Sequence, residues 1–327
     1  MNYSQQSEAI PAALFGLGTV GQGLYELTRD AGYPYLDLRK IVVRERDKPR
    51  QADSQLISQD GAAVLRDPEI RLIIELISDA DAAFDIVKTA LLSGKDVITA
   101  NKKMVAENLS ELLRIQGESQ GSLLYGAAVC GAIPAVQTLD HYLAYNKITA
   151  FQGVFNGTSN YILSQMEDGD SYAEALRKAQ ELGLAEADPT SDVEGWDAKY
   201  KLVISALHAQ GRVLPLCDVS NVGIHTIEKS DLEFARRNHW RIRHLALGES
   251  GEYRVLPMMT SSEQAAFHLR GEDNLIDIEA VEAGPQRLQG KGAGALPTAT
   301  AVLSDLERYR LGIRYLYTKR EQASAAP

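Results

Sequence analysis

The sequence predicts an α/β protein: a doubly wound parallel sheet in the first half and a second domain of α+β structure. In the first 130 or so residues, short apolar segments alternate with helical segments of about 10–15 residues, which is typical of βαβ units. A G-x-G-x-x-G pattern follows the first apolar segment. The length, 327 residues, suits about two domains rather than one.

The composition excludes several classes of protein. Hydrophobic residues make up 45% and charged residues 24% of the chain, as in ordinary globular proteins. No apolar run approaches the roughly 20 residues that span a bilayer, and a net charge of −10 argues against a nucleic-acid partner. Two cysteines, six scattered histidines and an N-terminus without secretory features favour a cytoplasmic protein without a disulfide framework or zinc site.

The elements of the first half follow in order. We expect strands at residues 10–15, 38–43, 71–77 and 96–101 and an extended segment at 122–129. We expect helices at residues 19–30, 81–94 and 108–119. Parallel sheets bind ligands at the carboxyl ends of their strands, so Ser78 and Lys102 are candidate site residues.

The segment GLGTVG has the spacing of a dinucleotide-binding loop. Gly16 permits the tight turn, Gly18 lets the backbone approach a pyrophosphate, and Gly21 lets the helix pack closely on the strand. Thr19 and Val20 begin the helix, whose N-terminal N–H groups suit phosphate oxygens. The first domain is therefore predicted to be Rossmann-like.

The end of the second strand bears on the choice of cofactor. An NAD-specific domain usually has a carboxylate there, whereas this chain has Arg44, with Arg46 and Lys48 just beyond. A guanidinium suits a 2′-phosphate, so NADP is the expected cofactor and NAD an alternative. Glu45 and Asp47 dilute the positive charge, and a solvated basic loop is the other interpretation. Strand alternation would turn Arg44 and Glu45 to opposite sides.

The second half contains a predicted long helix with paired charges. Ser191 and Glu194 form a capping-box pattern, which predicts a helix from about residue 192 to about 210. Asp197 and Lys201 are four residues apart and share one face of it. From this pattern alone, an exposed helix ion pair is the favoured interpretation. A buried apolar stripe is expected at Trp196, Val203 and Leu207.

Six segments together resemble homoserine dehydrogenases in order and spacing, from about residue 10 to about residue 315. They are GLGTVG, TANKK (99–103), AAVCGAIP (127–134), GVFNGTSNYIL (153–163), ELGLAEADPTSDVEGWDAKYKL (181–202) and KGAGALPTATAV (291–302). The resemblance implies NAD(P)-dependent interconversion of L-homoserine and L-aspartate 4-semialdehyde, in threonine, methionine and isoleucine biosynthesis. A non-catalytic NADP sensor and an oxidoreductase for another amino aldehyde are the alternatives.

The resemblance also implies catalytic and substrate-binding roles. Lys201 matches the family's proton donor to the carbonyl oxygen, and Lys102 matches a second lysine near nicotinamide and substrate. Glu186 and Asp197 match acidic residues that hold the substrate through its amino group. Asp192 matches another acidic position, for which helix N-capping is an equally good account.

The remaining implied positions lie on loops. Gly157 and Thr158 match a turn that approaches the substrate, and Gly292 matches a position near the cofactor. The loop of AAVCGAIP would hold a monovalent cation such as sodium through the carbonyls of Val129, Gly131 and Ile133. The family usually begins this loop with Glu, whereas this chain has Gly126, which leaves cation binding open.

We expect a nucleotide-binding domain over residues 1–133 and a substrate-binding and dimerisation domain over 134–290. Residues 291–327 would carry a C-terminal helix back to the nucleotide domain. The resemblance implies a homodimer or a dimer of dimers. It also predicts a short form of the enzyme, without a C-terminal regulatory domain.

Overall fold

The computed structural model describes residues 9–30, 32–46 and 48–320. Asp47, the start of the N-terminal segment and the tail EQASAAP lie outside the described residues. The chain divides into two units, one of residues 1–131 and 294–315, the other of residues 132–293 and the segment from Leu316 onward. Among the described helices, none has the length and apolar character needed to cross a membrane.

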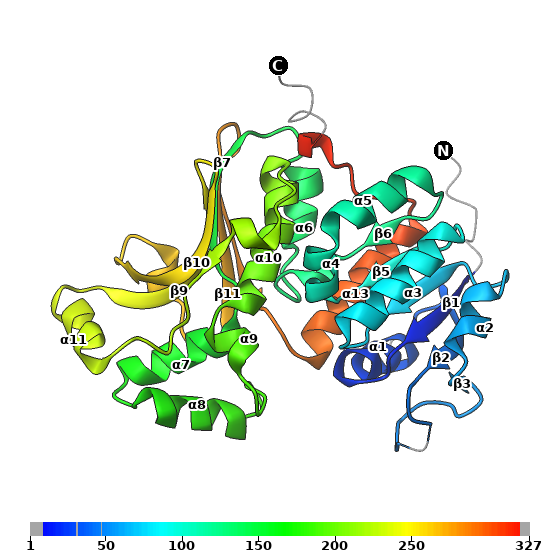
Figure 1. The fold of residues 1–327 in the computed structure, drawn as a ribbon, viewed down its shortest axis with the longest axis horizontal. Helices are drawn as coiled ribbons and strands as arrows, with labels where there is room; N and C mark the ends of the chain where they lie inside the picture. Colours follow the sequence, from blue (N-terminus) through cyan, green and yellow to red (C-terminus); the bar gives the residue numbers. More distant parts are fainter. Residues whose placement is uncertain (1–8, 31, 47, 321–327) are drawn as a thin grey trace. The chain divides into compact units, whose positions relative to one another are not determined.

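The first unit contains a parallel six-stranded sheet in the order β3-β2-β1-β4-β5-β6 (Figure 1), the order of a doubly wound dinucleotide-binding fold. Its strands are β1 (Ile10–Phe15), β2 (Leu36–Val42), β3 (Ile57–Ser58), β4 (Leu72–Glu75), β5 (Asp96–Thr99) and β6 (Leu123–Leu124). Its helices are α1 (Thr19–Asp30), α2 (Gly61–Arg66), α3 (Ala80–Leu92), α4 (Lys102–Glu107), α5 (Leu109–Glu118) and α13 (Ala295–Arg310). The predicted fold class is confirmed.

The extended segment expected at residues 122–129 is wrong over most of its length. Only Leu123–Leu124 pair as a strand, and a single 3₁₀ turn, η1 (Gly126–Ala128), follows. The cause is contact with a distant part of the chain. The backbone N–H of Gly126 donates to Asp305 Oδ2 at 2.7 Å, and that of Tyr125 donates to the Tyr315 hydroxyl at 3.0 Å. Because these partners lie some 180 residues away in sequence, the residues around Gly126 give no indication of the turn.

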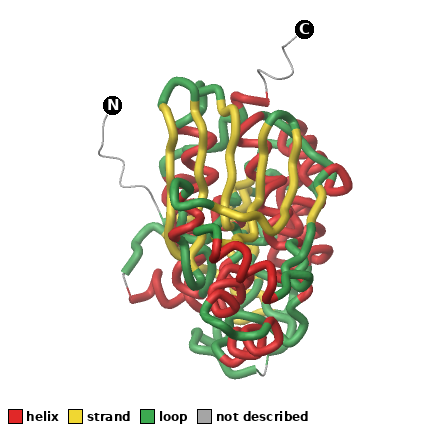
Figure 2. The backbone as a smooth tube through the Cα atoms, turned by 90° about the vertical axis from the view of Figure 1, so that its left-hand side faces the viewer, coloured by secondary structure: helices red, strands yellow, loops and turns green. Residues whose placement is uncertain are grey.

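The second unit is built on a six-stranded mixed sheet in the order β12-β11-β7-β9-β10-β8, whose strands run side by side in Figure 2. The strands are β7 (Ile148–Val154), β8 (Ser220–Asn221), β9 (Arg241–Glu249), β10 (Glu252–Thr260), β11 (Asp273–Ala280) and β12 (Gly284–Lys291). Strands β9 and β10 form a hairpin, and its turn has positive φ at Ser250 and Gly251.

The second unit also contains helices. They are α6 (Ala135–Gln137), α7 (Gly157–Glu167), α8 (Tyr172–Glu181), α9 (Thr190–Val193), α10 (Trp196–Gln210), α11 (Lys229–Arg237) and α12 (Ala265–His268). Of these, α7, α10, α11 and α12 pack against the mixed sheet. The turn η2 (Thr138–Tyr142) continues α6 with π-helical geometry. Helix α10 is buried on almost every side rather than along one stripe, and Trp196 is only half-buried.

The single helix predicted from residue 192 is wrong at its start. The chain forms the short α9, then passes through Gly195 at φ +83°, and only then begins α10. Neither helix has a side-chain N-cap, so the capping box of Ser191 and Glu194 does not form. A Cβ at Gly195 would lie 2.9 Å from the His244 ring, so close packing on β9 imposes the break.

The segment after α13 joins the second unit through a buried carboxylate. Asp140 Oδ2 accepts the backbone N–H of Leu316 at 2.7 Å, and Asp140 Oδ1 accepts that of Tyr317 at 3.2 Å. Asp140 Oδ1 also lies 2.9 Å from His208 Nδ1. Lys319 donates to the carbonyls of two residues near Asp140, and burial lowers its pKa to about 8.

In the first unit, Glu75 connects the ends of two central strands. Its side chain is fully buried, with Oε2 accepting the Thr99 hydroxyl at 2.6 Å and Oε1 accepting the Ile77 N–H at 2.6 Å. Thr99 Oγ1 in turn accepts the N–H of Asn101, and the Asn101 side chain donates to the Ile77 carbonyl. This network fixes the loops that carry Ser78 and Lys102. Burial raises the pKa of Glu75 to about 7.

The raised pKa of Glu75 predicts a pH-dependent stability. Between pH 4.5 and 7 the folded protein keeps a proton on Glu75 that the unfolded chain releases, so the free energy of unfolding falls as pH rises through this range. Glu75→Gln lacks this titration. By urea denaturation, the wild type should lose roughly 3 kcal/mol relative to Glu75→Gln across this window.

The exposed Glu69 provides the control for this measurement, because Glu69→Gln should keep the wild-type slope. An identical pH slope for wild type and Glu75→Gln would contradict the prediction.

Candidate functional site

The loop between β1 and α1 has the geometry of a dinucleotide cradle. Gly16 has φ +93°, and a Cβ there would lie 2.7 Å from the Leu76 carbonyl oxygen. A Cβ at Gly21 would lie 2.2 Å from the Gly16 carbonyl oxygen, whereas a Cβ at Gly18 would meet nothing within 4 Å. The first and third glycines therefore serve backbone packing, and the second faces open space that a pyrophosphate fits. Thr19 and Val20 begin α1 beside this space.

Arg44 lies just beyond β2, with 81% of its side chain exposed and one guanidinium nitrogen 3.6 Å from Asp79 Oδ2. It lines a hollow of about 730 Å³ together with Glu45, Arg46, Lys48 and Gln59. The expected alternation of Arg44 and Glu45 is wrong, because the strand ends at Val42 and both residues border the same hollow. Among the described residues, three cations and one carboxylate line it, a charge balance that suits a phosphate.

Ser78 and Lys102 follow β4 and β5, at the carboxyl edge of the sheet where ligands bind. Ser78 is exposed and Lys102 is half-buried. Lys102 is the first residue of α4, whose N-cap is Asn101, with Oδ1 accepting the Met104 N–H at 3.0 Å. This cap and the Glu75 network hold the backbone of both loops in place.

In the second unit, Asp197 and Lys201 form an ion pair that is almost fully buried. Lys201 Nζ lies 2.8 Å from Asp197 Oδ2, and the two side chains are 7% and 4% exposed. The exposed-pair interpretation is therefore wrong. Lys201 Nζ also donates to the Phe155 carbonyl at 2.5 Å. An ammonium has three N–H donors, and these two bonds account for all its hydrogen bonds with the described residues.

Asn156 organises the acidic groups around this pair. Its Nδ2 donates to Asp197 Oδ2 at 2.9 Å and to Asp192 Oδ1 at 2.6 Å, while its Oδ1 caps α7 by accepting the Ser159 N–H at 2.7 Å. Asp192 lies inside α9, so the N-capping account of it is wrong. The sequence motif points to a turn at Gly157 and Thr158 and does not single out Asn156 as a site residue. An Asn before a helical stretch is a capping signal, and only the fold shows its second function.

Asn274, on β11, is a second residue that the sequence analysis missed. Its Nδ2 donates at 2.8 Å to the Phe155 carbonyl, the oxygen that also accepts Lys201. Its Oδ1 is buried and has no hydrogen-bond partner among the described residues. Gly292 packs against this amide, since a Cβ there would overlap it at 2.0–2.4 Å. The structure thus places Gly292 beside Asn274 in the second unit.

The loop that carries Glu186 is tied to α7. The Thr158 hydroxyl donates to the Leu184 carbonyl at 2.7 Å. Gly157 packs against Glu272, the residue just before β11, because a Cβ at position 157 would lie 2.3 Å from the Glu272 carbonyl oxygen. Glu186 itself is exposed, and its carboxylate makes no hydrogen bond or ion pair with the described residues. The structure therefore joins Asp192, Asp197 and Lys201 in one network and leaves Glu186 outside it.

The predicted cation loop contains left-handed backbone at Cys130 (φ +57°) and Gly131 (φ +52°). Val129 and Gly131 fall in the first unit and Ile133 in the second, where the Ile133 carbonyl already accepts the Ala135 N–H at 2.7 Å. Within the described ranges, no group of three or more His, Cys, Asp or Glu side chains could hold a metal ion.

Comparison with known proteins matches almost the whole chain. The sequence model described as homoserine dehydrogenase, NAD binding domain, matches residues 16–126, and the one described as homoserine dehydrogenase matches residues 134–306. The homoserine dehydrogenase of Bacillus subtilis is 34% identical over 325 residues, which cover 94% of this chain and 75% of that protein. That of Corynebacterium glutamicum is 36% identical over 317 residues, covering 91% and 71%.

Solved structures agree. A homoserine dehydrogenase from Thiobacillus denitrificans superposes with a TM-score of 0.88 at 32% identity, covering 98% of this chain and 76% of that one. A hyperthermophilic archaeal homoserine dehydrogenase, solved in complex with NADPH, shares the fold with a TM-score of 0.83 at 24% identity, covering 94% and 99%. This chain belongs to the homoserine dehydrogenase family, the NAD(P)-dependent oxidoreductases that interconvert L-homoserine and L-aspartate 4-semialdehyde.

Proposed function

We propose that Lys201 is the proton donor of the homoserine dehydrogenase reaction and that Asp197, Asn156 and the Phe155 carbonyl hold it in position. The observation that carries this is the buried contact of Lys201 Nζ with Asp197 Oδ2 at 2.8 Å and with the Phe155 carbonyl at 2.5 Å. Two directional contacts fix the ammonium and leave its third N–H for a substrate oxygen. The bound nicotinamide supplies or accepts the hydride.

The ammonium then has two functions. Negative charge builds on the carbonyl oxygen when the aldehyde is reduced, and a cation in a nearly dry site stabilises that charge more strongly than it would in water. The same group can deliver the proton that makes the alcohol. Lys102, fixed at the start of α4, is proposed as the second lysine near the reacting groups.

Substrate recognition is proposed to depend on the acidic groups. The Glu186 carboxylate has no partner among the described residues, which suits the ammonium of homoserine, while Asp192 and Asp197 add negative charge near the Gly157–Thr158 turn. A non-catalytic sensor would have no use for a buried lysine held in this way.

For the cofactor we propose NADP(H), with the pyrophosphate at Gly16–Gly21, the 2′-phosphate at Arg44, and Ser78 and Gly292 as further cofactor positions. The three cations of the Arg44 hollow support this. So does the NADPH bound in the archaeal homoserine dehydrogenase of the same fold. A monovalent cation at the carbonyls of Val129, Gly131 and Ile133 and a dimer through the second sheet remain proposals drawn from the family resemblance.

Lys201→Ala should lower kcat by about 10²–10⁴-fold, the usual scale for loss of a general acid. NADPH binding, followed by fluorescence, should persist and would show that the first unit is folded. Lys199→Ala is the matched control, because Lys199 lies on the same helix but contacts Asn221 and the Trp196 ring instead. Retention of more than about a tenth of the rate in Lys201→Ala would contradict the role.

Glu186→Ala and Asp197→Ala should both impair the use of homoserine while leaving NADPH affinity near that of the wild type. Glu186→Ala should mainly raise KM for homoserine, since this carboxylate touches no other described group. Asp197→Ala should also lower kcat, because Lys201 loses its anchor. Unchanged KM for homoserine together with a large loss of NADPH affinity would overturn the assignment.

Arg44→Ala should reduce the preference for NADP over NAD, measured as the ratio of kcat/KM values. A charge-assisted bond contributes about 1.5–3 kcal/mol, or roughly 10- to 150-fold. Because Arg44 is largely exposed, we expect the lower end, about tenfold. Lys40→Ala, an exposed cation on β2 outside the hollow, serves as the control. A ratio unaffected by Arg44→Ala would exclude this residue as the selector.

A further inference from the structure

A second hollow lies within the second unit, at the opposite end of α7 from Asn156. Its volume is about 220 Å³, and it is bordered by the C-terminal end of α7, by α11 and by the start of β9. Helix α7 has 11 residues, so its two ends are about 16 Å apart. None of the proposed catalytic, substrate or cofactor residues lines this hollow.

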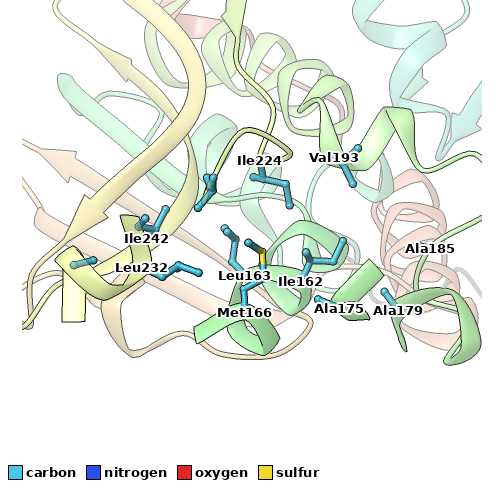
Figure 3. Close-up of a cluster of buried hydrophobic side chains, with 12 residues drawn as sticks. Ile162, Leu163, Met166, Ala175, Ala179, Ala185, Val193, Ile224, Leu232 and Ile242 are labelled. Carbon is cyan, nitrogen blue, oxygen red and sulfur yellow. The ribbon is translucent and has the colours of Figure 1, made fainter. Parts of the chain in front are cut away.

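The floor of the hollow is apolar. Met166, Leu232, Ala235 and Ile242 line it and belong to the buried cluster shared by α7, α8, α9, α11 and β9. Figure 3 shows Met166, Leu232 and Ile242 converging from three different elements. Trp240, 40% exposed, adds an aromatic wall at the rim.

The charged groups around this floor are unevenly paired. Each carboxylate has a basic partner: Glu167 has Arg243, Asp168 has Arg270, Asp170 has Lys178, and Glu233 has Arg237. Arg241 and Arg270, which also line the hollow, are used in pairs with Glu167 and Asp168.

By contrast, the side chains of Lys229 and Arg236 make no hydrogen bond or ion pair with any described residue. They are seven residues apart on α11, so two helical turns bring them to the same face. The hollow therefore presents two unpaired cations above an apolar floor.

We propose that this hollow binds a small aliphatic carboxylate, with the carboxylate group at Lys229 and Arg236 and the hydrocarbon body on Met166, Leu232 and Ile242. Arginine and lysine together offer donors to both carboxylate oxygens. The volume is below the roughly 300–1,000 Å³ of drug-sized sites, which limits the ligand to a few carbon atoms. The proposal is independent of the roles assigned to Lys201 and Arg44.

Calorimetric titration of the whole protein with four probes of equal carbon number tests this. The probes are butyrate, 2-oxobutyrate, L-2-aminobutyrate and n-butylamine. The three carboxylates should bind and n-butylamine should not. Comparison of butyrate with L-2-aminobutyrate shows whether the paired acidic groups also recognise an ammonium, which would narrow the ligand to an amino acid.

The double variant Lys229→Glu/Arg236→Glu should weaken butyrate binding by about tenfold or more. Lys147→Glu, which reverses another exposed cation of the same unit whose side chain pairs with no described residue, should leave it unchanged. Butyrate that binds at the proposed homoserine site would still bind to the double variant. Loss of binding in the double variant therefore identifies binding at the hollow. No butyrate binding to the wild type, equal binding to the double variant, or equal binding of n-butylamine would overturn the proposal.

Discussion

The second unit depends on one buried ion pair. An ammonium and a carboxylate withdrawn from water lose hydration energy, and only close geometry with additional hydrogen bonds offsets that loss. Lys201 and Asp197 meet this condition because Asn156 and the Phe155 carbonyl supply the additional bonds. Asn156, in the connection between β7 and α7, therefore has two functions: it caps α7, and it donates hydrogen bonds to two acidic side chains. In the proposed function, the buried Lys201 ammonium stabilises the negative charge that develops on the substrate oxygen.

Much of this could be predicted from the sequence because its signals are local. The alternation of apolar and helical segments predicts the parallel sheet that the structure contains. The spacing of Gly16, Gly18 and Gly21 predicts the close packing of the loop between β1 and α1. The four-residue spacing of Asp197 and Lys201 correctly placed them on one helix face. Spacing contains no information on burial, however, so the residues alone favoured an exposed pair, and only the family resemblance indicated a functional one.

The rest could not be predicted because it depends on residues distant in sequence. Packing of Gly195 against His244 splits a helix that the local pattern joins. Asp305 turns the backbone at Gly126, and Asn274 reaches the Phe155 carbonyl from 119 residues away. Glu75 is the clearest case: within LIIELI (72–77) it is the one polar residue, and its connection of two strand ends appears only when β4 and β5 pair. Polar contacts between residues distant in sequence therefore hold the candidate site residues of both units in place.

Rescue of Lys201→Ala by small primary amines would test most directly whether Lys201 is a proton donor held in place by Asp197. Ethylammonium added to Lys201→Ala can occupy the space left by the side chain and find the same two acceptors, Asp197 Oδ2 and the Phe155 carbonyl. The account predicts that homoserine oxidation by Lys201→Ala rises with ethylamine concentration and that the double variant Lys201→Ala/Asp197→Ala shows no such rise. No amine dependence in Lys201→Ala, or equal rescue of both variants, would contradict it.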